Sequence, residues 1–341
     1  MKVHSDIDGL SFDAMKALMR MRADKYELTV VEDRQDTLML ETDLGQFGVV
    51  DRAPSGLRLV IAALKPDNVH VIRDALVGQI AEAVPDIAER ITWSDMSEQD
   101  LYPPNLQFTE VVETRRLCTE FYRVTLRLDR PEAFAAEDAI HFRILLPEPE
   151  NTDPDYPTLA PNGSTKWPKG AKALHRPVYT ARSLRGDLVE MDVFIHEGGR
   201  ACDWAASVVP GARLAIIGPG GGGIVDQGPV VLAGDETAYP AIARIMDHLP
   251  AGTQGSVVLL SHERHRDYPF PGGHGLNVEW VDKTGFASAT RVALAATPDA
   301  HVWIAAERGQ TGKITSSQEL KAIPKTQRYI AGYWTSLKFE L

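Results

Sequence analysis

Apolar residues recur every three to four positions in two stretches near the start of the chain, and this spacing predicts helices over residues 11–22 and 66–82. Shorter apolar runs lie between them and predict strands at residues 38–41, 45–50 and 57–63. An acidic, proline-containing segment follows at residues 94–104. Residues 1–97 are therefore predicted to form a small α+β domain, and the acidic segment is predicted to be a linker.

From residue 105 the pattern changes to short strands with few helices. The strands are expected at residues 111–128, 139–146, 176–182, 188–195 and 214–217, with a short helix at 201–207. The stretch at 147–172 is rich in proline, asparagine and glycine, which is typical of a long loop. Such a series predicts an antiparallel β-barrel or sandwich over residues 105–227.

Beyond residue 228, continuous apolar runs alternate with helical patterns. Strands are expected at residues 230–234, 255–260, 277–281 and 301–306, with helices at 239–249 and 288–296. This alternation predicts a parallel sheet that is covered by helices on both faces. Residues 228–341 are therefore predicted to form an α/β domain.

The formal net charge of the 341-residue chain is −11, which together with the lack of a long basic run argues against nucleic acid as a partner. The two cysteines, Cys118 and Cys202, are too few for an iron–sulfur cluster and are typical of a reducing compartment. The sequence has no apolar stretch of about 18 residues and no signal-peptide pattern. We therefore expect a cytoplasmic protein without membrane insertion; the sequence does not predict its oligomeric state.

The segment from Arg176 to Arg182 reads RPVYTAR and combines residue types that suit a flavin. Guanidinium groups such as those of Arg176 and Arg182 bind a pyrophosphate in a bidentate manner. Tyr179 offers an aromatic face for the flavin ring, and Thr180 a hydroxyl for the N5 edge of that ring. On a regular strand Tyr179 would lie on the face opposite to the other three, so it would meet the ring at an edge or a kink. An ordinary surface strand would show the same alternation.

A glycine-containing turn follows and leads into the short predicted helix. The backbone N–H groups of such a turn can bind an anion, so it is a candidate second contact for phosphate. The candidate residues there are His196, Gly199, Ala201, Cys202 and Trp204.

The order of these motifs resembles that of the siderophore-interacting proteins, NAD(P)H-dependent ferric-siderophore reductases within the ferredoxin-reductase-like superfamily. The matching segments are residues 176–182, 194–196, 199–205, 210–212, 218–219, 232–242, 303–307 and 332–334. Arg200 and Cys202 stand where the family usually has Pro and Ser, while Ala212 and Ala306 replace an acid and a glycine. The resemblance implies an FAD-binding β-barrel domain and an NAD(P)H-binding parallel-sheet domain, with Tyr179 and Thr180 as catalytic residues. The N-terminal domain resembles one that often accompanies these reductases, and its role is not predicted.

Asp235, Thr237 and Ala238 follow a buried strand and open a helix. Ligands of open α/β sheets bind at the carboxyl ends of the strands, and the resemblance implies that NAD(P)H approaches the flavin here. The alternative is a simple helix cap provided by Asp235 or Thr237. The glycine run at 218–223 does not follow a strand of the α/β domain, which favours a connecting segment near the flavin over a phosphate loop.

A flavin can take two electrons from NAD(P)H and pass them one at a time to ferric iron. The hard oxygen donors of a siderophore bind ferrous iron more weakly than ferric iron, so reduction releases the metal. We therefore expect a ferric siderophore as the substrate, held in a basic cleft by Lys313, Lys325 and Arg328. A second basic cluster follows the strand expected at residues 255–260 and comprises His262, Arg264, His265 and Arg266. For each cluster the simpler reading, which the sequence favours, is a solvated loop, and the second cluster lacks the ligand spacing of a metal site.

Three functions remain open on the sequence alone. The first is a ferric-siderophore reductase. The second is a flavin-dependent oxidoreductase with another acceptor, such as free flavin, a quinone or a carrier protein. The third is a non-enzymatic module that binds a flavin and a siderophore.

Overall fold

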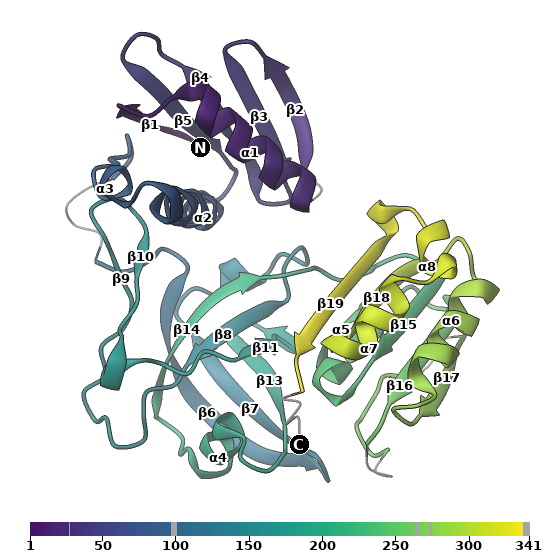
Figure 1. Cartoon of the computed structure of the whole chain (residues 1–341). Coiled ribbons are helices and arrows are strands. Elements are labelled where there is room, and N and C mark those ends of the chain that lie inside the picture. Colours follow the sequence, from purple (N-terminus) through teal and green to yellow (C-terminus); the bar gives the residue numbers. More distant parts are fainter. Residues whose placement is uncertain (27, 97–100, 263–265, 273–274, 337–341) are drawn as a thin grey trace, which may run out of the picture. The chain divides into compact units, whose positions relative to one another are not determined.

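The computed structural model describes residues 1–26, 28–96, 101–262, 266–272 and 275–336 of the chain (Figure 1). By their contacts the residues divide into two compact units. The first unit comprises Met1–Leu106 and Pro147–Leu174. The second comprises Gln107–Leu146 and His175–Leu341.

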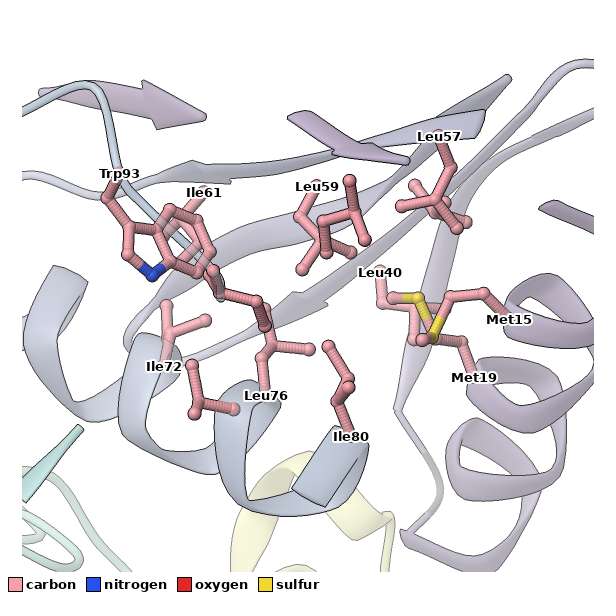
Figure 2. Packing of buried hydrophobic residues seen from close by; sticks show 14 of the residues in the cluster. Met15, Met19, Leu40, Leu57, Leu59, Ile61, Ile72, Leu76, Ile80 and Trp93 are labelled. Carbon is pink, nitrogen blue, oxygen red and sulfur yellow. The ribbon is translucent and has the colours of Figure 1, made fainter. Parts of the chain in front are cut away.

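The first unit is built on a five-stranded antiparallel sheet with the order β1-β5-β4-β3-β2. The strands are β1 (Lys2–Asp8), β2 (Thr29–Arg34), β3 (Thr37–Thr42), β4 (Gly45–Asp51) and β5 (Gly56–Ala62). Helices α1 (Phe12–Tyr26) and α2 (Pro66–Ala83) bury their apolar sides against the sheet, and the short α3 (Pro85–Ala88) follows. Figure 2 shows this core, in which Leu59 and Ile61 of β5 face Leu76 and Ile72 of α2.

The apolar pattern predicts α1, α2 and β3 to β5, but neither β1 nor β2. In β1 the buried positions Val3 and Ile7 alternate with solvent-facing residues, but a buried serine, Ser5, stands between them and breaks the apolar pattern. β2 is exposed at all but one of its positions, so it has no apolar face by which it could be recognised.

Residues 147–174 include the stretch at 147–172 that was expected to be a loop, and they contain two short antiparallel strands, β9 (Thr158–Leu159) and β10 (Thr165–Lys166). They also contain a 3₁₀ turn at Gly170–Lys172. The segment packs with the first unit, although both of its ends continue into the second.

The second unit begins with a seven-stranded sheet in the order β11-β8-β14-β6-β7-β13-β12. The strands are β6 (Leu106–Cys118), β7 (Phe121–Leu128), β8 (His141–Leu145), β11 (Val178–Thr180), β12 (Ser183–Arg185), β13 (Leu188–Phe194) and β14 (Arg213–Gly220). β8 pairs antiparallel with β11 and β14, and β7 with β6 and β13. Helix α4 (Arg200–Ser207) packs on β7 and β13. The antiparallel fold is as predicted.

The strand ladder of this sheet does not close into a barrel within the described residues. Its two edge strands, β11 and β12, follow one another in the chain. The Ala181 N–H donates to the Ile140 carbonyl at 2.8 Å, and the Arg182 N–H donates to the Glu190 carbonyl at 2.7 Å. The sheet therefore curls until one segment, residues 178–185, supplies both of its edges.

A five-stranded parallel sheet completes the second unit, in the order β17-β16-β15-β18-β19. Its strands are β15 (Val230–Gly234), β16 (Gln254–Leu260), β17 (Gly275–Val281), β18 (His301–Glu307) and β19 (Arg328–Trp334). Helix α5 (Tyr239–His248) covers one face, and α6 (Phe286–Ala296), α7 (Arg308–Thr315) and α8 (Gln318–Ala322) cover the other. The strand order reverses between β15 and β18, which makes this the expected place for a ligand.

The predicted parallel sheet with helices on both faces is thus confirmed, but α7, α8 and β19 are not contained in the apolar pattern. α7 has a polar sequence, RGQTGKIT, and buries only Gln310, Thr311 and Ile314. No helix among the described residues combines the length and the apolar character needed to cross a bilayer.

Candidate active site

A cavity of about 550 Å³ lies in the second unit, and its size is within the range of small-molecule and cofactor sites. The side chains that line it come from β7, β8, β11 and β13 of the antiparallel sheet. Further lining residues come from the turn after β15, the start of α5 and β19, and Arg176, Pro177 and His196 lie in the segments next to β11 and β13. The cavity therefore brings together the two parts of the chain that were expected to hold a flavin and a nicotinamide.

Two cations line the cavity, Arg143 of β8 and Arg176 in the segment before β11. Arg143 Nη1 donates a hydrogen bond to the Arg176 carbonyl at 3.0 Å. Burial, and then the charge of Arg176, lowers the pKa of Arg143 below its ordinary value. Two neighbouring guanidinium groups repel each other, so an anion between them would be stabilised. Arg143 was not identified from the sequence, although it interrupts an apolar strand.

Tyr179 and Thr180 line the same cavity as Arg176. Thr180 is buried, and burial raises the pKa of the partly buried Tyr179 well above its ordinary value. The alternation predicted for residues 176–182 does not extend to Arg182, because β11 ends at Thr180 and the chain turns there. Arg182 Nη1 instead donates to Asp247 Oδ2 of α5 at 2.5 Å, and Arg182 is not among the residues lining the cavity.

Only one residue of the predicted phosphate turn, His196, lines the cavity. Cys202 is buried in α4, where its Sγ donates to the Phe194 carbonyl at 2.9 Å. Gly199 has no room for a side chain, because a Cβ there would lie 2.5 Å from Cys202 Sγ and 2.7 Å from His196 Cε1. Ala201 is also buried, whereas Trp204 is partly buried against the core beneath the helix. Cofactor contacts by these residues remain a prediction.

The carboxyl end of β15 carries a buried carboxylate, Asp235. Its Oδ1 accepts hydrogen bonds from the Thr237 N–H at 3.1 Å and the Thr237 hydroxyl at 2.6 Å. Its Oδ2 accepts from the Glu307 N–H at 2.7 Å and from Trp334 Nε1 at 2.8 Å. Burial raises the pKa of Asp235 despite these donors. Asp235 therefore caps the turn, as expected for a simple helix cap. It also links β15, β18 and β19 by hydrogen bonds where the strand order reverses.

The neighbouring residues Glu236 and Thr237 line the cavity, whereas Asp235 and the buried Ala238 do not. The Glu236 carboxylate is buried and accepts from the His262 N–H at 2.6 Å. His262 Nδ1 also lies 2.9 Å from Glu236 Oε2. His262 thus hydrogen-bonds to the turn after β15. Two other members of its predicted cluster, Arg264 and His265, lie outside the described residues.

A hydrogen bond between His141 and Tyr333 joins the two sheets at the cavity, with 2.6 Å between His141 Nε2 and the Tyr333 hydroxyl. His141 is buried and Tyr333 is partly buried, and their rings meet edge to face. Two residues of the glycine run pack near this pair, since a Cβ on Gly221 would lie 2.9 Å from His141 Nδ1 and one on Gly222 2.4 Å from the Tyr329 ring, whereas a Cβ on Gly220 would meet nothing within 4 Å. This close packing favours a connecting segment over a phosphate loop.

His141 is expected to stay neutral at physiological pH. Burial, and then the positive charge of Arg244, lowers its pKa from 6.5 to about 4. Because the folded-state pKa is depressed, unfolding takes up a proton between these two values, and the stability of the second unit should fall as the pH drops from 6.5 toward 4. An NMR titration, with the ring signals assigned through His141→Asn, measures the value. A pKa near that of a free histidine would contradict this environment.

The predicted substrate residues Lys313, Lys325 and Arg328 lie on α7, the following 3₁₀ turn and the start of β19. None of them is among the described residues that line the cavity. Arg328 Nη1 donates to the Leu320 carbonyl at 3.0 Å. A role in substrate binding by these three remains a prediction.

The residues of the cavity fit an FAD. Arg143 and Arg176 supply guanidinium donors for a pyrophosphate, and Tyr179 supplies aromatic surface. The buried Thr180 supplies a hydroxyl. Trp334, held at the other side by Asp235, adds a second aromatic side chain.

Two family models match successive parts of the chain. The model of the siderophore-interacting FAD-binding domain matches residues 110–223, and that of the siderophore-interacting protein matches residues 228–336. Both matches begin after residue 109, so most of the first unit lies outside them.

The chain is also similar to curated ferric reductases. It is 27% identical over 246 residues to an NADPH-dependent ferric-chelate reductase of Escherichia coli, which covers 67% of this chain and 94% of that protein. It is 29% identical over 169 residues to the ferric vibriobactin reductase ViuB of Vibrio cholerae, which covers 47% of this chain and 59% of that protein.

Solved structures share the fold. A siderophore utilization protein from T. fusca has a TM-score of 0.54 at 24% identity, covering 71% of this chain and 97% of that one. The siderophore-interacting protein SipS from Aeromonas hydrophila has a TM-score of 0.54 at 21% identity, covering 69% of this chain and 94% of that one. The family models, the relatives and the motifs around Arg176–Arg182 agree, and the chain belongs to the siderophore-interacting protein family of FAD-binding proteins.

Proposed function

We propose that this protein is a reductase that uses FAD to pass electrons from NADPH or NADH to a ferric siderophore, which releases ferrous iron in the cytoplasm. One observation carries the proposal. A single cavity is lined both by Arg176, Tyr179 and Thr180 and by the turn that follows β15. A donor bound at the parallel sheet and a flavin bound at the antiparallel sheet would therefore meet.

In this proposal the antiparallel sheet holds the FAD. Arg176, with Arg143 beside it, would bind the pyrophosphate, and His196 and the turn at Gly199 would provide further phosphate contacts. Tyr179 would orient the ring, and the Thr180 hydroxyl would hydrogen-bond its N5 edge. A bound flavin supplies the step from two-electron to one-electron transfer.

The nicotinamide cofactor would bind at the carboxyl ends of β15 and β18. Asp235 holds Thr237 and the backbone of Glu307 in place through hydrogen bonds of 2.6–3.1 Å, so the turn is formed before a ligand arrives. Trp334 is hydrogen-bonded to the same carboxylate and lines the cavity, so its indole would contact a ligand bound there.

Ferric siderophores that carry negative charge would be attracted to a basic rim. The ferric-chelate and vibriobactin reductases among the relatives support this class of acceptor. Arg143 and Arg176 are the cations that line the cavity, and Lys313, Lys325 and Arg328 are additional candidates.

The decisive experiment is anaerobic stopped-flow spectroscopy of the FAD-loaded protein with NADPH, NADH and a panel of ferric siderophores. We expect one or both nicotinamides to bleach the flavin, and at least one ferric siderophore to restore its colour while a ferrous-specific chelator reports iron release. If quinones or free flavins restore the colour and no ferric chelate does, the acceptor is misassigned. The protein is then a flavin-dependent oxidoreductase with another substrate.

A further inference from the structure

Two buried carboxylates line the cavity of the second unit, Asp192 of β13 and Glu236 of the turn after β15. Asp192 forms an ion pair with Arg123, whose guanidinium nitrogens lie 2.6 and 2.8 Å from its two oxygens. The Tyr268 hydroxyl also donates to Asp192, at 2.7 Å. The charge of Asp192 is therefore compensated by a permanent cation, whereas the described partner of Glu236 is a histidine.

That histidine, His262, extends from Glu236 toward solvent. The His262 N–H donates to Glu236 Oε1 at 2.6 Å, and the imidazole Nδ1 lies 2.9 Å from Glu236 Oε2. The Glu236 side chain is 3% exposed and the His262 side chain 39%. His262 is not among the described residues that line the cavity. The pair therefore runs outward from the cavity wall, with a buried carboxylate at one end and a solvated imidazole at the other.

Two titratable neighbours of Glu236, Asp235 and Tyr239, are engaged in other contacts. The Tyr239 hydroxyl donates to the Leu260 carbonyl at 2.6 Å. Asp235 accepts four hydrogen bonds and does not line the cavity. Glu236 thus differs from both, because it lines the cavity and its partner can carry a proton on either of two ring nitrogens.

The proposed reaction has to dispose of a proton. Its balance is NAD(P)H + 2 Fe³⁺ → NAD(P)⁺ + 2 Fe²⁺ + H⁺, so each turnover frees one proton where the cofactors meet. A cofactor bound in the cavity displaces water that could otherwise accept this proton. A carboxylate in the wall can accept it instead, and an imidazole can take up a proton at one nitrogen and release one from the other.

We propose that Glu236 and His262 form a proton outlet of the cavity. The Glu236 carboxylate accepts the proton freed in the cavity and passes it to His262 Nδ1, and the proton on His262 Nε2 leaves to water. Exchange with water then restores the starting tautomer of the imidazole. The two electrons go to the ferric acceptor, so no other reactant is needed. The inference rests on the proposed function for the source of the proton.

The test uses the FAD-loaded full chain and the variants Glu236→Gln and His262→Gln. Glutamine at position 236 has nearly the same shape and keeps an oxygen for the His262 N–H, but it cannot take up a proton. Glutamine at position 262 removes the imidazole and leaves the backbone donor. The matched control is His248→Gln, because His248 Nε2 lies 3.4 Å from Glu137 Oε1 and its side chain is 37% exposed. Neither His248 nor Glu137 lines the cavity.

The first measurement follows flavin colour and proton release together. The flavin is reduced photochemically and oxidised with hexacyanoferrate(III) in weakly buffered solution that contains a pH indicator, so neither a nicotinamide nor a siderophore takes part. We expect both signals to slow by about a hundredfold in Glu236→Gln and by about tenfold in His262→Gln. Added imidazole should restore the rate of His262→Gln, and His248→Gln should behave as the unmodified protein does.

The second measurement is the midpoint potential of the bound flavin, which is an equilibrium property. A carboxylate that faces the flavin disfavours the negative charge gained on reduction, so Glu236→Gln should raise the potential and His248→Gln should leave it unchanged. Unaltered rates in both Glu236→Gln and His262→Gln, or an unaltered potential in Glu236→Gln, would overturn the proton outlet. Failure of every ferric siderophore to oxidise the flavin would instead refute the proposed function, and the results with hexacyanoferrate(III) would still stand.

Discussion

Replacing Arg176 and Tyr179 with alanine is expected to give a folded protein that is purified without flavin. The substitution removes a charge-assisted contact to phosphate and the aromatic side chain next to Thr180, both of which line the cavity. Together these should cost about 4 kcal/mol of binding free energy, on the order of a thousandfold in the FAD dissociation constant. Visible absorbance of the purified protein and calorimetric titration with FAD measure the effect.

Arg182→Ala is the matched control for this variant. Arg182 belongs to the same sequence motif, but its guanidinium donates to Asp247 at 2.5 Å and is not part of the cavity lining. We expect this variant to retain its FAD. A protein that keeps stoichiometric FAD after loss of Arg176 and Tyr179, or that loses it only on removal of Arg182, would refute the proposed flavin site.

Gly234→Ala is expected to have the largest effect at the nicotinamide side. A Cβ at this position would lie 2.5 Å from the Ala238 Cβ and 2.8 Å from the Ala305 carbonyl oxygen, so the backbone of the turn would have to move. Such overpacking costs about 3 kcal/mol. Because the displaced turn carries Asp235 and Thr237, we expect a lower melting temperature together with strongly reduced reduction of the flavin by NADPH.

Gly312→Ala provides the comparison. Gly312 lies inside α7, and a Cβ there would meet nothing within 4 Å. Alanine in a helix interior should therefore stabilise the protein by about 0.5–1 kcal/mol. Equal melting temperatures and equal rates of flavin reduction for the two variants would show that the close packing after β15 has no role.

Sequence patterns predicted elements well where packing is uniform along them. β15 is apolar throughout and has the predicted bounds, Val230–Gly234, because both of its faces are buried. The sequence patterns did not predict elements that lack a regular apolar face, such as the exposed β2 and the polar α7. The open sheet also differs from the predicted barrel, since its edge strands of three residues each are set by the turn at Ala181 and not by apolar periodicity.

The site was predictable only where its residues are neighbours in the sequence. Arg176, Tyr179 and Thr180 do line one cavity. His141 and Tyr333 stand 192 positions apart, and nothing in either local pattern indicates that they share a hydrogen bond. Arg182 was placed with the flavin residues because a strand was assumed to continue past Thr180, whereas the chain turns there to join the other edge of the sheet.

The segment at residues 178–185 affects how readily the protein should aggregate when no cofactor is bound. It forms both edges of the antiparallel sheet, and unpaired sheet edges are templates for aggregation. A ligand that binds only the folded state stabilises it in proportion to the logarithm of its concentration over the dissociation constant. FAD bound at the cavity as proposed would therefore protect the edge strand Val178–Thr180, which lines it, and should lower the tendency of the purified protein to aggregate.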